Sequence, residues 1–310
     1  MKVLYLIQTH KNPEQIYRLI KTIKKLATTS YILVCHNFTY SNLDVAPLQT
    51  LPEVKVISSK RELGDFSIIQ EYLEVISWLL SQNIEFDWLI NLTGQDYPTQ
   101  PLSQLEKFLL ETQYDGFLEY FEAFSDLEPK NWRGREGRDR YLYNYWRLYR
   151  YLPRWQRALI KLPRIFINNT QPFVRIKLSY GLMVGVRTPS SPFNEKFLCY
   201  AGSYFHILSR KCIQYLDNFS KHHPNLISYY SNKYVPDESL IQSILVNSKL
   251  FNLCNDNMRY INWGNTEYDG PRILTVKDYP VLSKDDVYFA RKLDMSYDSE
   301  ILDMLDARIF

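Results

Sequence analysis

The sequence predicts an α/β protein with a mostly parallel central sheet flanked by helices. Over the first hundred residues, short apolar runs typical of strands alternate with segments of helical periodicity, which is the pattern of βαβ units. At 310 residues the chain can bury one large core, and it contains no repeat and no low-complexity linker. We therefore expect one domain over residues 1–310, with a division into two near 128–187 as the alternative.

The first half of the chain gives the clearest elements. Val3–Ile7 is an apolar run that predicts a buried first strand. Pro13 then begins a helix, because proline suits the first helical turn, and apolar residues from Ile16 to Ile23 recur at helical spacing. The further strands expected here are Tyr31–Cys35, Val54–Ser58 and Trp88–Leu92, and the further helices are Ile68–Leu80 and Ser103–Leu110.

The second half predicts a similar mixture after a segment of unusual composition. Leu182–Val186 and Tyr200–Ser209 have strand character. Ser209–Phe219 predicts a helix with a serine cap, and Pro236–Leu245 predicts a helix capped at its start.

The composition is that of an ordinary folded protein. It is 45% hydrophobic and 23% charged, and its mean hydropathy is −0.32, which excludes a disordered or fibrous chain. No apolar run reaches the roughly 18 to 20 residues of a membrane span. The four cysteines lie far apart and predict neither a zinc site nor a disulfide framework. The first residues resemble a strand more than a signal peptide, so we expect a cytoplasmic protein.

The unusual segment is a basic, aromatic block, which we expect to be an insertion at about 128–187. Lys130–Arg187 contains 14 Lys or Arg and two acids, with many tyrosines and tryptophans from Tyr141 to Ile167. Such a block suits contact with an anionic membrane, which for a cytoplasmic protein is the inner face of the cell membrane, or with an acidic glycan. A solvated insertion is the third interpretation. Nucleic acid is not expected, because RNA-recognition strings are absent.

Several common catalytic motifs are missing. The chain has neither the P-loop pattern nor G-x-G-x-x-G after the first strand, and it has no G-x-S-x-G nucleophile elbow. Asp-x-Asp, a pair that holds a divalent metal against a sugar nucleotide in many transferases, does not occur. If the protein handles a diphosphate, cationic side chains must take the place of the metal.

Four local strings occur in an order and at spacings that resemble one known family. They are residues 92–98 (LTGQDYP), 201–210 (AGSYFHILSR), 235–243 (VPDESLIQS), and 259–263 (RYINW) followed by 289–294 (FARKLD). The chain resembles the core-2/I-branching glycosyltransferases, glycosyltransferase family 14, which also contains the peptide O-xylosyltransferases. This resemblance extends from Val3 to about Asp294.

The resemblance implies a GT-A-like nucleotide-sugar-binding fold and an inverting transfer without a metal or other cofactor. The sugar, usually N-acetylglucosamine or xylose, would pass from a UDP donor to a hydroxyl of a glycan, lipid-linked or protein acceptor. A binding module that keeps this fold to hold a nucleotide sugar or a membrane surface, without catalysis, is the alternative.

The resemblance also assigns the site residues. Glu238 matches the family's catalytic base, and Asp237 before it would cap a helix, orient Glu238 or line the substrate pocket. Lys292 matches the lysine that neutralises the diphosphate, and Arg272, about twenty residues earlier, matches its arginine partner by spacing. Arg259 and Arg291 are nearby substitutes.

The remaining predicted contacts lie in loops after strands, where ligands of parallel sheets bind. Asp65, Gln95 and Asp96 are expected to hold the donor, although Leu63 replaces the tryptophan that often precedes Gly64 in the family. Ser203 and Tyr204 are expected to line the substrate pocket; Tyr204 departs from the family pattern and leaves the donor and acceptor preference open.

Overall fold

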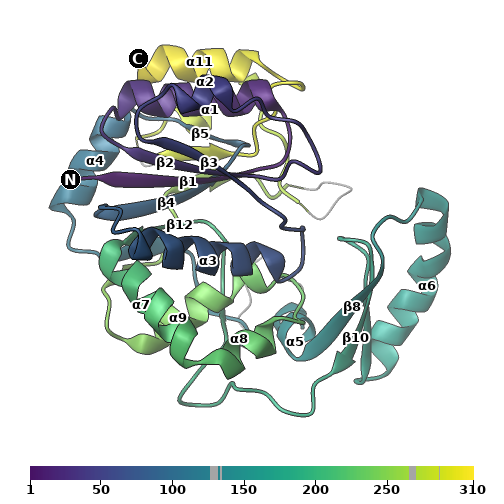
Figure 1. Cartoon of the computed structure of the whole chain (residues 1–310). Coiled ribbons are helices and arrows are strands. Elements are labelled where there is room, and N and C mark those ends of the chain that lie inside the picture. Colours follow the sequence, from purple (N-terminus) through teal and green to yellow (C-terminus); the bar gives the residue numbers. More distant parts are fainter. Residues whose placement is uncertain (126–131, 133–134, 265–269, 286) are drawn as a thin grey trace.

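The computed structural model describes residues 1–125, 132, 135–264, 270–285 and 287–310. Its centre is a seven-stranded sheet of order β13-β6-β12-β4-β1-β2-β3 (Figure 1). Neighbouring strands are parallel except around β12, which is antiparallel to both β4 and β6. The strands are β1 (Val3–Thr9), β2 (Tyr31–His36), β3 (Val54–Ser58), β4 (Trp88–Thr93), β6 (Gly116–Leu118), β12 (His206–Ser209) and β13 (Leu253–Cys254). The predicted mixed α/β fold with a large, mostly parallel sheet is confirmed.

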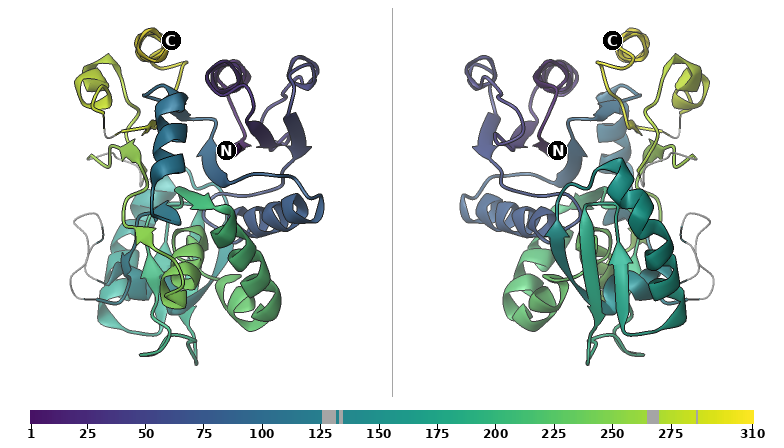
Figure 2. Two further views of the ribbon diagram at one scale, coloured as in Figure 1. Left: turned by 90° about the vertical axis from the view of Figure 1, so that its left-hand side faces the viewer. Right: turned by 90° about the vertical axis from the view of Figure 1, so that its right-hand side faces the viewer.

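Helices cover both faces of this sheet (Figures 1 and 2). The upper face in Figure 1 packs α1 (Pro13–Leu26), α2 (Ala46–Gln49), α4 (Leu102–Glu111) and α11 (Glu300–Ile309), and the lower face packs α3 (Ser67–Ser81), α7 (Arg210–His222) and α9 (Leu240–Ser248). The shorter helices are α8 (Pro224–Tyr230) and α10 (Tyr279–Leu282), with 3₁₀ turns η1 (Pro236–Glu238) and η2 (Val276–Asp278).

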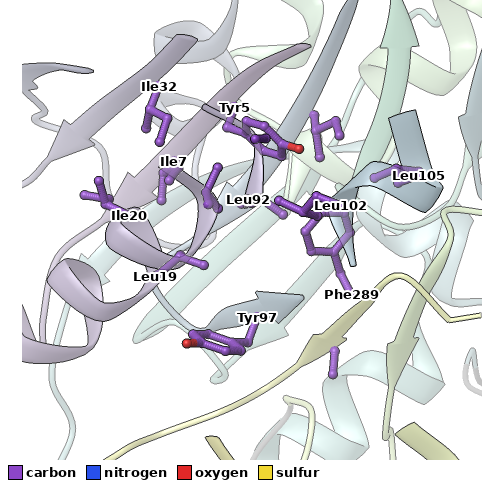
Figure 3. Close-up of a cluster of buried hydrophobic side chains, with 14 of the residues drawn as sticks. Tyr5, Ile7, Leu19, Ile20, Ile32, Leu92, Tyr97, Leu102, Leu105 and Phe289 are labelled. Carbon is purple, nitrogen blue, oxygen red and sulfur yellow. The ribbon is translucent and has the colours of Figure 1, made fainter. Parts of the chain in front are cut away.

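Strand β1 explains why both faces must be covered. All seven of its residues are buried, and successive side chains point to opposite faces of a strand. Val3, Tyr5 and Ile7 belong to the hydrophobic cluster of the upper face, part of which Figure 3 shows, whereas Leu4 and Leu6 belong to that of the lower face. The unbroken apolar run that predicted this strand is therefore the pattern of a strand inside the sheet.

Two smaller sheets form in addition to the seven-stranded sheet. Strands β14 (Arg259–Ile261), β15 (Phe289–Arg291) and β5 (Asp96–Pro98) form one, in which β5 is antiparallel to β15. Strands β7 (Phe121–Glu122) and β11 (Tyr200–Ala201) form an antiparallel pair. The first of these sheets joins the loop after β4 to the last part of the chain.

The described part of the basic block builds a sheet of its own. It consists of α5 (Glu136–Tyr141), β8 (Tyr143–Tyr149), α6 (Arg154–Thr170), β9 (Val174–Lys177) and β10 (Leu182–Arg187). The three strands are antiparallel in the order β8-β10-β9, apart from the seven-stranded sheet (Figure 1). Residues 128–131 and 133–134 of the predicted insertion lie outside the described residues.

Two predicted elements were wrong in detail. Pro236–Leu245 is not one helix, because Ser239 separates η1 from α9 with an extended φ of −145° and donates its hydroxyl to Tyr200 O at 2.7 Å. Tyr200–Ser209 is two strands, β11 and β12, rather than one. Ser209 stands at the start of α7 as predicted, but it makes no side-chain capping bond to the helix backbone.

Within the described residues, no helix combines the length and the apolar character needed to cross a bilayer.

Gly202 lets three segments approach closely. Its backbone N–H donates to Glu238 O at 2.9 Å, which joins the loop before β12 to η1. A Cβ atom at this position would lie 1.9 Å from the backbone oxygen of Glu119, at the end of β6. Only glycine fits here without displacing one of these backbones.

We expect Gly202→Ala to lower the free energy of unfolding by about 1–3 kcal/mol, because the added methyl group overlaps backbone that cannot rotate away. Denaturant unfolding followed by circular dichroism measures this. Gly270→Ala is the matched control, since a Cβ there would meet nothing within 4 Å. Equal midpoints for the two variants would contradict the packing argument.

Candidate active site

The loops that carry the predicted site residues Asp65, Gln95 and Asp96 leave the same edge of the sheet. Strands β1, β2, β3 and β4 are parallel, and their last residues are in register: Gln8 opposes Thr93, Thr9 opposes His36, and His36 opposes Ser58. The loops that follow these strands therefore begin side by side. This edge is where parallel α/β sheets bind ligands.

A group of cations lies at this edge. Burial and the neighbouring charges of Lys11 and Arg291 lower the pKa of Lys292. Burial, followed by the charges of Arg61, Lys11 and Lys292, lowers the pKa of His10 to about 4. Asp294 balances part of this charge through an ion pair of 2.8 Å with Lys11. The surplus of positive charge suits an anionic ligand.

Gln95 lies directly beside the lysine segment. Its backbone oxygen accepts a hydrogen bond of 2.9 Å from Leu293 N, and its side-chain nitrogen is 3.4 Å from Leu293 O. The side chain is buried, with 7% of the residue exposed. The structure thus brings Gln95 and Lys292 together, as the sequence prediction required.

Asp96 is fully buried and engaged by protein groups. Its Oδ2 lies 3.1 Å from Arg291 Nη1 and accepts hydrogen bonds from the backbone and hydroxyl of Thr93, and its Oδ1 lies 3.4 Å from Arg259 Nε. Both guanidinium groups stack on the ring of Phe205, at 4.3 Å for Arg259 and 4.2 Å for Arg291. In this arrangement Asp96 holds arginines in place rather than facing an open surface.

Arg272 lies on a segment that runs beside Lys292. Leu274 N donates to Lys292 O at 2.8 Å, and Arg272 N donates to Asn262 O at 2.8 Å. The Arg272 guanidinium forms an ion pair with Asp278 and is 41% exposed. The backbone therefore brings the two predicted cations to adjacent segments, with Arg272 held by a carboxylate.

A second group of residues surrounds Glu238. Arg140, from α5, donates to Glu238 Oε2, and its Nε lies 2.7 Å from Glu136 Oε1. Lys177, from β9, lies 2.9 Å from Glu136 Oε2. The insertion thus contributes a row of alternating charges that fixes the Glu238 carboxylate, which keeps 23% of its side chain exposed. Glu238 lies before the first residue of α9 rather than within a longer helix.

Asp237, unlike its neighbour Glu238, is buried. It is 7% exposed, and its Oδ1 has no hydrogen-bond partner among the described residues. Burial and the negative charge of Glu238 raise the pKa of Asp237 to about 8. The two adjacent carboxyl groups thus differ in their surroundings, because Asp237 is buried whereas Glu238 is partly exposed and paired with Arg140.

Glu119, which the sequence prediction did not include, belongs to the same group. Desolvation and the negative charge of Glu238 raise the pKa of Glu119. It follows β6 and adjoins Gly202, so its place depends on a contact between segments far apart in the chain.

Asp65 fixes the insertion to the edge of the sheet. Its Oδ1 accepts from Ser67 N at 3.0 Å, and its Oδ2 lies 3.4 Å from Arg147 Nη1 on β8. Arg147 also donates to Leu63 O at 2.7 Å. The Tyr180 ring lies against Gly64, whose φ of +77° and lack of a side chain permit this contact.

The segment from Gly202 to Phe205 connects the Glu238 group to the lysine group. Gly202 N donates to Glu238 O, and Tyr204 donates its hydroxyl to Gln8 Oε1 of β1 at 2.6 Å. The ring of Phe205 stacks against the guanidinium of Arg291, the residue directly before Lys292. Both groups therefore adjoin one four-residue segment at the same edge.

The predicted pocket residues of this segment lie mostly inside the protein. Ser203 is 6% exposed and Tyr204 is 8% exposed, and Ser203 O accepts from Gln242 at 2.6 Å. The Tyr204 ring packs against Tyr72 and His206. Its surroundings are those of a core aromatic residue rather than of an open stacking face.

A comparison with known protein families shows which family this chain belongs to. The family described as "Branch: Core-2/I-Branching enzyme" matches residues 3–283. The chain belongs to the Core-2/I-Branching enzyme family.

Curated relatives of this family member are distant. The chain is 21% identical over 246 residues to Beta-glucuronosyltransferase GlcAT14A of Arabidopsis thaliana, covering 77% of this chain and 46% of the relative. It is 22% identical over 255 residues to GlcAT14B of the same plant, covering 78% and 48%. Xylosyltransferase sqv-6 of Caenorhabditis briggsae is 26% identical over 124 residues, covering 38% and 15%. The chain spans about half the length of the two plant enzymes.

A solved structure, the crystal structure of HddC from Yersinia pseudotuberculosis, matches 69% of this chain and 78% of its own at 11% identity. Its TM-score is 0.30, which is too low to identify the fold.

In this Core-2/I-Branching family member, the described residues contain no group of three or more His, Cys, Asp or Glu arranged to hold a metal ion. The residues that sequence reasoning missed are Arg140, Glu119 and Lys11. Arg140 lay within the basic block, where nothing distinguished it from thirteen other cations. Lys11 directly follows the first strand, and its position at that strand end was the available signal.

We expect Asp237 to make stability depend on pH. With a folded pKa near 8 and an ordinary value of 3.8, the folded protein keeps a proton that the unfolded chain has released, so the free energy of unfolding falls as pH rises from about 4 to 8. Asp237→Asn should therefore lose less stability than the wild type between pH 5 and pH 8 in thermal denaturation. Asp285→Asn, at an exposed carboxylate, should follow the wild type. A parallel fall in wild type and Asp237→Asn would refute the assignment.

Proposed function

We propose that this protein transfers a sugar from a UDP donor to a hydroxyl of a glycan, lipid-linked or protein acceptor, on a GT-A-like fold. Membership of the Core-2/I-Branching enzyme family supports glycosyl transfer, and the curated relatives are named for glucuronosyl and xylosyl transfer. The observation that carries the proposal is the common edge at which Glu238, and Arg291 directly before Lys292, contact the segment from Gly202 to Phe205.

Glu238 is the proposed base of an inverting single displacement. The acceptor oxygen attacks the anomeric carbon while the bond from that carbon to the diphosphate oxygen breaks, and the hydroxyl proton passes to the carboxylate. The bond from Arg140 to Oε2 fixes the direction of the carboxylate, and partial exposure leaves the group accessible to an incoming hydroxyl. Burial and the charge of Glu238 raise the pKa of the neighbouring Asp237 to about 8, which disfavours a second negative charge beside the proposed base.

Cations are proposed to stabilise the departing UDP in place of a divalent metal. Lys292, Lys11 and Arg291 lie near one another, and burial together with the charges of Lys11 and Arg291 lowers the pKa of Lys292. Negative charge grows on the diphosphate as its bond to the sugar breaks. Cationic side chains therefore stabilise the transition state more than the bound substrate. Arg272 reaches this group if its guanidinium exchanges Asp278 for a phosphate oxygen.

The identity of the donor sugar is determined by assays with several UDP-sugars. The family resemblance favours UDP-N-acetylglucosamine and UDP-xylose, and the two plant relatives add UDP-glucuronic acid. Hydrolysis or transfer with each donor, alongside calorimetry with UDP, also separates an enzyme from a binding module, which would bind UDP without turnover.

We expect Glu238→Gln to reduce transfer by at least about 100-fold, since the variant cannot accept the hydroxyl proton. Affinity for UDP should stay within a few-fold, because Glu238 is not part of the cation group. Initial rates and UDP calorimetry give the two values. Glu195→Gln, at an exposed glutamate, is the control. Transfer by Glu238→Gln at the control's rate would remove Glu238 from the mechanism.

We expect Lys292→Met to weaken UDP binding by about tenfold or more and to lower kcat, because a preorganised donor to the leaving group is commonly worth about 3–4 kcal/mol. Lys277→Met, an exposed lysine of η2, should leave both values unchanged. The assays are run with and without EDTA. Unchanged UDP affinity in Lys292→Met, or a strict need for Mn²⁺, would contradict the proposed role of the cations.

A further inference from the structure

Helix α6 turns an apolar stripe away from the protein. Trp155, Leu159, Leu162 and Phe166 follow one another at intervals of four, three and four residues, which places them on one helical face. Their exposed fractions are 64%, 68%, 76% and 68%, and no residue of this 17-residue helix is buried. An ordinary surface helix turns its apolar face inward, so this orientation is unusual.

The opposite side of α6 is fixed to its sheet by polar contacts. Asn168 donates from its side-chain amide to Ile176 O at 3.0 Å and accepts from Ile176 N at 2.9 Å. These two bonds pair the helix with β9 and determine which face points outward. The apolar stripe is therefore left facing solvent by the way the helix is attached.

The apolar surface continues onto the neighbouring sheet. Trp146 and Leu148 are two residues apart on β8 and so share a face, and Val184 and Val186 of β10 pair with Trp146 and Asn144. In Figure 2 (right), the three strands and α6 stand in front of the rest of the molecule. The exposed large apolar residues of this region are Trp146, Leu148, Tyr149, Tyr151, Trp155, Leu159, Leu162, Ile165, Phe166, Phe173 and Val186.

The same region is rich in cations, although Arg140, Arg147, Arg150, Arg175 and Lys177 form ion pairs with acidic residues. From Arg140 to Asn194 the chain has ten Lys or Arg and no Asp or Glu. Four of these cations lie on α6, namely Arg154, Arg157, Lys161 and Arg164. The cations lie on the other side of the helix from the apolar stripe, with Arg154 and Lys161 exposed, and such a division into an apolar and a cationic side is the pattern of a helix that lies in a membrane interface.

We propose that α6 and the outward face of the β8-β10-β9 sheet dock on the surface of an anionic lipid bilayer. The cations match the negative surface potential of such a bilayer, and the apolar stripe gains free energy only where it leaves water. A hydrated polyanion, such as an acidic glycan or a nucleic acid, satisfies the cations but offers nothing to Leu159 and Leu162. A second copy of the chain would oppose one basic surface with another.

This docking surface is firmly joined to the candidate site. Arg147 of β8 pairs with Asp65, and Arg140 of α5 pairs with Glu238, so the insertion holds the edge of the site on one side and presents the apolar stripe on the other. The proposal does not require catalysis, because vesicle binding is measured without a donor or an acceptor.

The test is sedimentation of the full chain with vesicles, either of phosphatidylcholine alone or of equal parts of phosphatidylcholine and phosphatidylglycerol. The wild type should bind the anionic vesicles and not the neutral ones. Leu159→Gln with Leu162→Gln should weaken binding by about tenfold or more, because two side chains no longer enter the apolar layer. The matched control is Leu110→Gln with Leu250→Gln, two leucines that are 70% and 68% exposed elsewhere.

A second pair of changes separates charge from apolar contact. Arg154→Gln with Lys161→Gln should weaken binding by about fivefold for each cation removed. Circular dichroism verifies that every variant keeps the wild-type fold.

Two outcomes would overturn the proposal. One is the absence of wild-type binding to the anionic vesicles at low salt. The other is binding that is lost in the charge variant, unchanged in the Leu159 and Leu162 variant, and reproduced with heparin, which would identify a soluble polyanion as the partner.

Discussion

The carboxylate of Asp96, buried between two arginines, fixes the position of the segment that carries the candidate donor-binding cations. Asp96 lies on β5, Arg259 on β14 and Arg291 on β15, so one carboxylate joins all three strands of the small sheet. Loss of one partner in such a pair leaves a buried charge uncompensated, at a cost of about 3–5 kcal/mol. Lys292 follows Arg291 directly, and its place at the edge of the main sheet depends on this contact.

The basic block contributes residues to the candidate site. Its residues Arg140 and Lys177, with Glu136 between them, arrange the charges around Glu238, and its Arg147 holds the loop at Asp65. The seven-stranded sheet provides the edge at which the loops meet. The basic block provides Arg140, the cation that pairs with the proposed base.

The sequence predicted the parts of this structure that local patterns determine. Val54–Ser58 has the predicted bounds, and β1 differs only at its end, because an apolar run records burial on both faces. The environment of Glu238 was not predictable in this way, since its partner Arg140 lies 98 residues away. Asp96 was expected to face a ligand, and its burial follows from Arg291, 195 residues later. Ser239 interrupted a predicted helix through a bond to Tyr200, a contact that no local pattern encodes.

The two faces of strand β8 have different roles. Because its side chains alternate, Tyr145 and Arg147 face the protein while Trp146 and Leu148 face outward. Substitutions on the outer set can change the proposed docking surface without changing the side chains of the inner set, so the two faces can vary independently during evolution. A displacement of the outer set is nevertheless transmitted through the same backbone to Arg147 and its partner Asp65.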